Sequence, residues 1–314
     1  MNERPLITGS LAYDNIMDFN GRIADRIMPE KIHVISLSFL VESLRRQLGG
    51  TAGNVAYSAH LLNLEPTICS VLGNDADPYL LFLKQKGISA KHIRVVLDEL
   101  TSNYFVVTDI EDNQIGAFSI GAGKYSSELD ISACGPTSFA ALTPTQPEAM
   151  TRYVRDCKKL NIPFLFDPAF QIGSMPEDEL HEGVQSAQIF IGNDYEVALA
   201  EKRLGFTHRE LLGAVPIVIT TLGSKGSRIE THEECIEVPI AKPTAVVDPT
   251  GAGDAYRGGF LGGYLRGFDL RRCGNMGAVA AVYAVEHRGT MEHVYTIDEF
   301  RERYKTNFGE ALPL

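Results

Sequence analysis

Short apolar runs alternate with helical segments along most of this chain, and few folds accommodate that order. The runs are rich in β-branched residues and read PLITG, PTICSVLG, IPFLFDP, AQIFIGN and VPIVITTLG, which is typical of buried strands. Between Glu148 and Asn161, apolar residues recur at helical spacing directly before one of these runs. Strands that alternate with helices of this length predict a mostly parallel sheet with helices on both faces.

Further elements are predicted on either side of that pattern. One helix is expected after Gly53 and another near Asp254. The segments at about 13–48 and 101–120 contain strand-like runs without a helix between them, including VISLSFLV, YFVVTD and IGAFSI. We expect them to be antiparallel additions to the main sheet that form a small lid over the ligand crevice. No repeat or linker divides the chain, so the prediction is one α/β domain over residues 1–314.

Charge and cysteine content exclude several classes of protein. The 29 basic and 40 acidic residues give a net charge of −11, which repels nucleic acid but permits a phosphate ligand held by backbone amides. The five cysteines are widely spaced, without the pairs typical of disulfide frameworks or zinc ribbons. No signal-peptide pattern or apolar run of about 20 residues is found, so the sequence predicts a cytoplasmic protein that does not enter a membrane.

The segment VVDPTGAGDAYRGGFLGGYLRG has the strongest chemical signature. Gly251 and Gly253 let the backbone approach a ligand closely, and the first amides of the following helix point toward it. Asp254 adds a carboxylate at the same place. Taken alone, these residues fit a capped helix start equally well.

Three other nucleotide-binding patterns are absent. No Walker A motif is found, because Lys124 is followed by Tyr125 rather than by Ser or Thr. The protein-kinase motifs His-Arg-Asp and Asp-Phe-Gly are missing. The first strand is followed by GSLAYD instead of the glycine pattern of a dinucleotide-binding fold, which argues against a dehydrogenase.

Over nearly its whole length the sequence resembles the pfkB or ribokinase-like carbohydrate kinases, and among them the bacterial adenosine kinases. The resemblance rests on GSLAYDNIMDF, SLSFLVESL, GGTAGN, TDIEDNQI, NDYE, TTLGSKG and DPTGAGDAYRGGFL, which occur in the family's order and spacing. It implies a ribokinase-like α/β fold with a small β-sheet lid.

The resemblance also implies roles for individual residues around the transferred phosphoryl group. Asp254 matches the catalytic base, and Gly251, Ala252 and Gly253 match the anion hole whose amides stabilise the transferring phosphoryl group. Asp14 matches the residue that accepts hydrogen bonds from two sugar hydroxyls. The other expected sugar contacts are Gly50 and Asn54.

Two further motifs match residues that bind the nucleotide in this family, and each also has a simpler structural interpretation. Asn193 and Glu196 match the family's Asn-x-x-Glu, which organises Mg²⁺ through water, but a capped helix start is the alternative. Thr221, Gly223 and Gly226 match the loop that lines ATP, and the alternative is a turn between two strands.

The base site is expected to be aromatic. Tyr104 and Phe118 on the lid and Phe170 after a main-sheet strand are aromatic where the resemblance places the base site, although aromatic residues on strands are more often packing residues. Nearby hydrogen bonds are expected from Ser10, Ser38 and Gln171. The chain departs from the adenosine-kinase pattern at IGAGK and at Phe170.

The resulting prediction is an ATP- and Mg²⁺-dependent adenosine kinase that forms AMP and ADP. The alternatives are a ribokinase-like sugar kinase, a broader nucleoside kinase and, in another class, a non-catalytic nucleoside sensor. The lid runs VISLSFLV and YFVVTD are apolar at successive positions, so both of their faces need cover. We therefore expect a homodimer formed through the lids.

Overall fold

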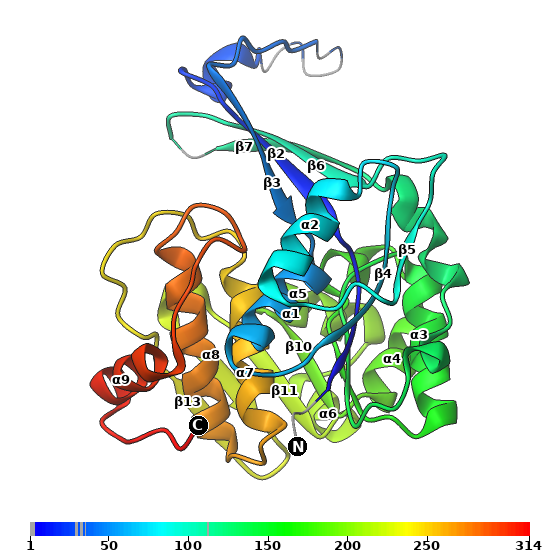
Figure 1. The fold of residues 1–314 in the computed structure, drawn as a ribbon, viewed down its shortest axis with the longest axis vertical. Helices are drawn as coiled ribbons and strands as arrows, with labels where there is room; N and C mark the ends of the chain where they lie inside the picture. Colours follow the sequence, from blue (N-terminus) through cyan, green and yellow to red (C-terminus); the bar gives the residue numbers. More distant parts are fainter. Residues whose placement is uncertain (1–3, 29–30, 32–33, 35, 112) are drawn as a thin grey trace.

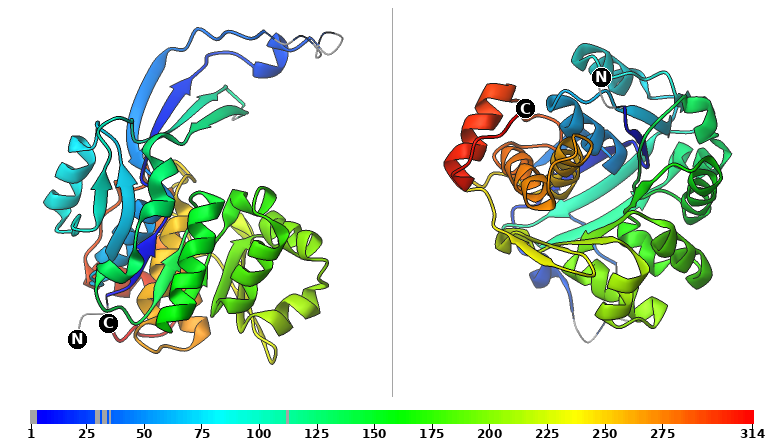
Figure 2. Two further views of the ribbon diagram at one scale, coloured as in Figure 1. Left: turned by 90° about the vertical axis from the view of Figure 1, so that its right-hand side faces the viewer. Right: turned by 90° about the horizontal axis from the view of Figure 1, so that it is seen from below.

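The computed structural model describes residues 4–28, 31, 34, 36–111 and 113–314. These residues form a nine-stranded sheet between two layers of helices, and a separate four-stranded sheet that projects from the main body (Figures 1 and 2). In spatial order the strands of the large sheet are β13 (Cys235–Val238), β12 (Ser227–Glu230), β11 (Ile217–Thr221), β10 (Ile189–Asn193), β9 (Phe164–Phe166), β8 (Ala140–Leu142), β1 (Leu6–Thr8), β4 (Thr67–Leu72) and β5 (Ile93–Val95).

The large sheet is parallel from β11 to β5, and β12 and β13 extend one edge as an antiparallel hairpin. Each of the five apolar runs in the sequence forms one of its strands, so the predicted parallel sheet is confirmed. Successive side chains of a strand enter opposite layers: Ile189 and Ile191 pack in one hydrophobic cluster and Phe190 in the other. The core is therefore two apolar layers on either side of the sheet.

Helices cover both layers. One layer contains α1 (Thr51–Leu61), α2 (Asp77–Lys86), α7 (Ala252–Tyr264), α8 (Leu270–Val285) and α9 (Ile297–Phe308), and the other α3 (Pro147–Leu160), α4 (Glu177–Ser186), α5 (Asp194–Leu204) and α6 (His208–Ala214). Short 3₁₀ turns complete the fold: η1 (Ile23–Arg26), η3 (Gly121–Glu128), η4 (Ile131–Cys134), η5 (Ala169–Gly173) and η6 (Gly223–Lys225). Within these described ranges, no helix is long and apolar enough to cross a membrane.

Two predicted helices begin slightly before the expected points. The helix expected after Gly53 is α1, which already begins at Thr51, and the helix expected near Asp254 is α7, which begins at Ala252. Helix α7 packs closely on α8 because its glycines leave no side chain between them: a Cβ at Gly259 would lie 2.6 Å from the carbonyl oxygen of Met276. This packing fixes the amino end of α7 above the sheet.

The four-stranded sheet, called the lid here, differs from the prediction. It has the order β3 (Ser43–Gly49), β2 (Ala12–Asp18), β6 (Ser102–Thr108) and β7 (Gln114–Ser119), and it is a separate sheet rather than an antiparallel addition to the main one (Figure 2). Strands β2 and β6 pair in parallel. A parallel pair needs a long connection, and here the chain between the two strands forms β3, α1, β4, α2 and β5.

The predicted lid strand VISLSFLV was also wrong, since the structure places β3 a few residues later. Ile35 of that run and Asp112 of the predicted lid turn lie outside the described residues. The strand β3 is polar, and its Arg45 Nη1 lies 2.6 Å from Asp18 Oδ2 of β2. A lid strand that is open to solvent is stabilised more by such a cross-strand ion pair than by a run of apolar side chains.

Candidate active site

Two cavities flank the amino end of α7. The lid-side cavity, of about 350 Å³, is lined by Ser10, Ala12, Asp14, Gly50, Thr51, Asn54, Tyr104, Phe118, Phe170, Thr250, Gly251, Asp254 and Thr290. The hairpin-side cavity, of about 440 Å³, is lined by Asn193, Thr221, Gly223, Ser224, Gly226, Ser227, Ile240, Ala241, Pro243, Val246, Pro249, Ala252, Gly253, Tyr256, Ala278, Ala281, Val282 and Val285. The first turn of α7 contributes residues to both, so it lies between them.

Asp254 holds a defined position at this boundary. The Nδ2 of Asn54, on α1, donates a hydrogen bond to Asp254 Oδ2 at 2.7 Å. Burial raises the pKa of the Asp254 carboxyl, and Arg257 and the hydrogen bond from Asn54 act in the opposite direction. The preceding turn needs glycine, because Gly251 has a φ of +79°. A carboxylate held beside the first amides of a helix is suited to accept a proton next to a bound anion.

Asp14, Tyr104 and Phe118 form one row across the lid. Asp14 pairs with Tyr104 between β2 and β6, and Tyr104 pairs with Phe118 between β6 and β7. Directly paired residues project to the same face of a sheet, so all three enter the lid-side cavity. Burial, together with the charges of Asp254 and Asp248, raises the pKa of Asp14 to about 6.

An aromatic pair lines the lid-side cavity. The rings of Phe118 and Phe170 have centroids 6.3 Å apart, and their side chains are 46% and 64% exposed. Both rings therefore present open apolar surface to the cavity, which core packing does not explain. A flat apolar ligand group would cover that surface.

Most predicted sugar and base contacts meet in the lid-side cavity, but two do not. Ser10, Gly50 and Asn54 line it, as do the lid residues and Phe170. Ser38 lies in the exposed segment before β3, and Gln171 lies on η5 with its Oε1 accepting a hydrogen bond from Ser174. Neither residue lines the cavity. Sequence reasoning missed Ala12, Thr51, Thr250 and Thr290. The first three lie within the motifs GSLAYDNIMDF, GGTAGN and DPTGAGDAYRGGFL, whereas Thr290 lies outside every motif.

The hairpin-side cavity combines a polar and an apolar wall. Thr221, Gly223 and Gly226 lie at the hairpin between β11 and β12, so the turn given as the alternative is present. All three also line this cavity. The apolar wall comes from α8, where Ala278, Ala281, Val282 and Val285 repeat at helical spacing. Sequence reasoning missed this wall, although the all-round apolar run AVAAVYAV contains it.

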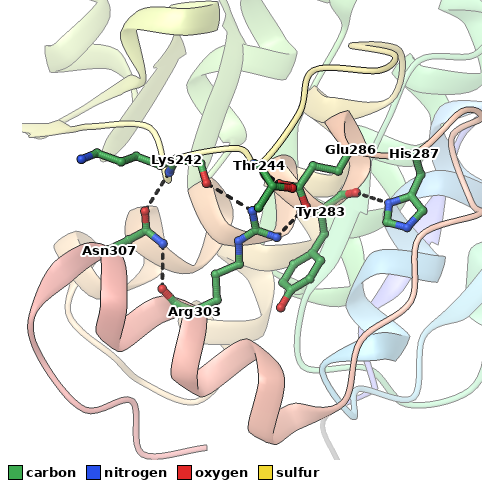
Figure 3. A network of polar contacts seen from close by, with 7 residues as sticks. All are labelled: Lys242, Thr244, Tyr283, Glu286, His287, Arg303 and Asn307. Carbon is green, nitrogen blue, oxygen red and sulfur yellow. Dashed lines mark hydrogen bonds and ion pairs between the residues drawn. The ribbon is translucent and has the colours of Figure 1, made fainter.

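A polar network fixes the loop that forms another wall of this cavity (Figure 3). Glu286 Oε1 accepts hydrogen bonds from the N and Oγ1 of Thr244 at 2.5 and 2.8 Å, and Arg303 Nη1 donates to Glu286 Oε2 at 2.7 Å. The backbone N of Lys242 donates to Asn307 at 2.7 Å. Burial opposes ionisation of Glu286, but the bonds from Arg303 and Thr244 lower its pKa to about 2. The loop is thus held against α8 and α9 by a charged group.

Asn193 and Glu196 form a capping box at the start of α5. Asn193 Oδ1 accepts from the Glu196 N, and Glu196 Oε2 accepts from the Asn193 N, both at 2.8 Å. The capped helix start is therefore present, and Asn193 also lines the hairpin-side cavity. In the described part of the chain, no three His, Cys, Asp or Glu side chains are arranged to hold a metal ion directly. The capping bond uses one oxygen of Glu196, which fits a contact to Mg²⁺ through water better than a protein cage.

The chain is similar to known kinases over almost all of its length. The model of the pfkB family carbohydrate kinases matches residues 17–297. A nucleoside kinase of Methanocaldococcus jannaschii is 32% identical over 276 residues, which cover 87% of this chain and 91% of that protein. The nucleoside kinase of Burkholderia thailandensis in complex with inosine has a TM-score of 0.91 at 33% identity, covering 98% and 99% of the two chains. Its complex described as ADP-inosine has a TM-score of 0.88 at 34% identity, covering 98% and 97%.

Proposed function

The chain belongs to the pfkB family of carbohydrate kinases, and from that premise we propose that it is an ATP-dependent nucleoside kinase. One observation carries the proposal: the first turn of α7 lies between two cavities, with Asp254 in the lid-side cavity and Ala252 and Gly253 in the hairpin-side cavity. A donor and an acceptor bound on either side of that turn would meet at its amides and its carboxylate.

The proposed acceptor is a nucleoside, and the proposed specificity is broader than the adenosine predicted from the sequence. The exposed Phe118 and Phe170 rings favour a ligand with a flat base over a free sugar. The similar proteins are called nucleoside kinases, and one of them was solved with inosine. We therefore propose that adenosine is one of several purine nucleosides accepted.

Asp254 is proposed to act as the base. Its carboxylate accepts the proton of the ribose 5′-hydroxyl while the new bond from that oxygen to the γ-phosphorus forms and the bond to the leaving ADP oxygen breaks. Asn54 keeps the accepting carboxylate oriented. The amides of Gly251, Ala252 and Gly253 stabilise charge on the transferring phosphoryl group.

The other predicted residues bind the two substrates in this proposal. Asp14 accepts hydrogen bonds from two ribose hydroxyls, and the hairpin between β11 and β12 lies along the ATP phosphates and ribose. Bound Mg²⁺ would neutralise charge on the β- and γ-phosphates. Glu196 would orient the water molecules of that ion, and Asn193 would contact them from the cavity wall.

A substrate panel tests this function. ADP release is measured with ATP and adenosine, inosine, guanosine, cytidine, ribose or fructose, with an Asp254→Asn preparation as the control for contaminating kinases. We expect adenosine and inosine to turn over well and both free sugars to turn over poorly. Preferential use of ribose or fructose would support the sugar-kinase alternative, and ligand binding without turnover of any compound would support the sensor.

Phe118→Ala is expected to weaken nucleoside binding by roughly 1–3 kcal/mol, the range for loss of one base–aromatic stack. ATP binding should change little, because Phe118 lines only the lid-side cavity. Calorimetric titration with each ligand measures both. Tyr104→Phe is the milder comparison, since it keeps the ring and removes only a hydroxyl. A loss of ATP affinity without a loss of nucleoside affinity would contradict the assignment of the two cavities.

The homodimer remains a proposal, now based on different residues. On the lid face opposite Asp14, a row of apolar side chains crosses all four strands: Leu44, Met17, Val107 and Ile115. Leu44 and Ile115 are 65% and 42% exposed. The same lid face of a second copy, related by a two-fold axis, would cover this row.

Ile115→Asp is expected to dissociate the dimer and to lower activity, because the strands of this row also carry the binding residues on their other face. Light scattering at the assay concentration measures the assembly. Leu81→Asp, at an exposed apolar position on α2, is the matched control. Phe39 is less suitable for this test because it packs edge-on against Phe19 with ring centroids 5.0 Å apart. A fully active parent monomer would refute the proposal.

A further inference from the structure

Arg257 is a buried arginine one turn after Asp254 on α7. It is 7% exposed and lines neither cavity. Its Nε lies 2.6 Å from Asp167 Oδ2, and its Nη2 donates to Asp167 Oδ1 at 3.0 Å. Asp167 is fully buried and directly follows β9. This pair, one hydrogen bond and one ion-pair contact, ties the amino end of α7 to the carboxyl edge of the sheet.

The third nitrogen of the guanidinium lies beside the proposed anion hole. A Cβ at Gly253 would be 3.0 Å from Arg257 Nη1, so the guanidinium packs against this residue of the hairpin-side cavity. The guanidinium donates a hydrogen bond from Nη2 to Asp167, and its Nε contacts Asp167 as an ion pair, so Asp167 lies at the edge opposite Nη1. The pair with Asp167 therefore orients a positive charge toward the place where the phosphates are proposed to bind.

The surroundings of Asp254 are otherwise rich in negative charge. Six side chains from different parts of the chain interact electrostatically or by a hydrogen bond with Asp254: Asp14, Asn54, Tyr79, Asp167, Glu196 and Arg257. Arg257 is the only cation in that set. Burial raises the pKa of Asp254 and of Glu196, and Arg257 lowers the pKa of both. Without Arg257, the carboxylates of Asp167, Asp254 and Glu196 would repel one another with no cation among them, next to an anionic donor.

We propose that Arg257 is a positioning residue for phosphoryl transfer: fixed by Asp167, its guanidinium holds the first turn of α7 and supplies the positive charge that keeps Asp254 ionised. This inference rests on the proposed function, since only a proton-accepting Asp254 needs to be ionised. Lysine keeps the charge but lacks the planar fork that pairs with Asp167 at two points. The two contributions of Arg257 are therefore separable by substitution.

The dependence of kcat on pH tests the proposal in Arg257→Met, Arg257→Lys and the parent. Arg257→Met is expected to move the acidic limb of the profile to higher pH by about one unit or more, because loss of an adjacent cation raises the pKa of a carboxyl. Turnover should thus fall more at low pH than at high pH, with KM for both substrates little changed. Arg257→Lys should restore the position of the limb while kcat stays low.

A double variant separates charge from folding. Arg257→Met alone leaves Asp167 buried without its partner, and that loss can prevent folding. Asp167→Asn combined with Arg257→Met removes both charges, and it should melt close to the parent. Because Asp167 repels the Asp254 carboxylate, its loss offsets part of the loss of Arg257, so the limb should move in the same direction but by less than in Arg257→Met. Arg272→Met, which removes an arginine on α8 outside both cavities, should leave the limb in place.

A readout independent of turnover completes the test. Carboxyl ¹³C signals of labelled aspartates are titrated by NMR, and the Asp254 signal is identified by its loss in Asp254→Asn. A higher titration midpoint in the double variant than in the parent supports the electrostatic part of the inference. This readout does not depend on turnover, so its failure is distinguishable from failure of the proposed function in the substrate panel. An unchanged midpoint together with an unmoved limb would overturn it, because a merely structural role alters neither.

Discussion

Asp254→Asn is expected to lower kcat for nucleoside phosphorylation by about 10²- to 10⁴-fold, the usual contribution of a positioned general base. Asparagine has the same shape but cannot accept the proton of the 5′-hydroxyl. Its side-chain oxygen can still accept the hydrogen bond from Asn54, so the first turn of α7 should keep its geometry. The expected loss is therefore in turnover and not in binding.

Calorimetric titration is the appropriate binding measurement, since the chain contains no tryptophan for a fluorescence assay. Affinities for ATP and nucleoside should stay close to those of the parent. Asp269→Asn provides a comparison, because Asp269 caps the next helix by accepting a hydrogen bond from the Arg272 N and lines neither cavity. That variant should keep its kcat. Near-parental turnover in Asp254→Asn would remove Asp254 from the role of base.

The main sheet was predictable because its strands are buried on both faces. Such strands are continuous apolar runs, and those that contain Phe166, Phe190 and Ile219 are recognisable without any tertiary information. The lid lacks that signal. Its strand β3 has arginines at two successive positions, Arg45 and Arg46, while the described residues of the apolar run before it are not in a strand. Pairing partners and not composition determine such a strand, and pairing is not readable from local sequence.

The candidate site was predictable where motifs end strands or begin helices. Asp254 and Asn193 are of this kind, because the carboxyl ends of neighbouring parallel strands meet at one edge. The apolar wall around Ala281 was missed because a buried helix face and a ligand-facing helix face have the same composition. Thr290 was missed because it joins the lid-side cavity only through the packing of the chain after α8. Contacts made by tertiary packing alone leave no local pattern.

The motif at Asn193 shows that two interpretations of one pattern need not exclude each other. The capping box occupies the side-chain oxygen of Asn193 and one oxygen of Glu196. The same bonds hold both side chains in fixed orientations, and Asn193 also lines the hairpin-side cavity. The structure confirms the cap. The water-mediated contact to Mg²⁺ stays a proposal, and the cap is compatible with it because fixed side chains suit such a contact.

Asp14 is expected to make nucleoside binding depend on pH. The pKa of its carboxyl is raised to about 6 by burial and by the charges of Asp254 and Asp248. The ionised form accepts hydrogen bonds from two hydroxyls, whereas the protonated form has one oxygen that carries a proton. As the pH falls through about 6, the ionised fraction declines, so KM for the nucleoside should rise while KM for ATP stays nearly constant.

Asp14→Asn should remove this dependence and raise KM for the nucleoside at neutral pH by about 10- to 100-fold, since hydrogen bonds to a charged group contribute about 1.5–3 kcal/mol. A nucleoside that lacks the 2′- and 3′-hydroxyls supplies the matched control. With that analogue, the parent and the variant should bind equally weakly, and the pH dependence should disappear from both. If Asp14→Asn weakened the analogue as much as the nucleoside, the carboxylate would act through the shape of the cavity, and its assignment to the ribose hydroxyls would fail.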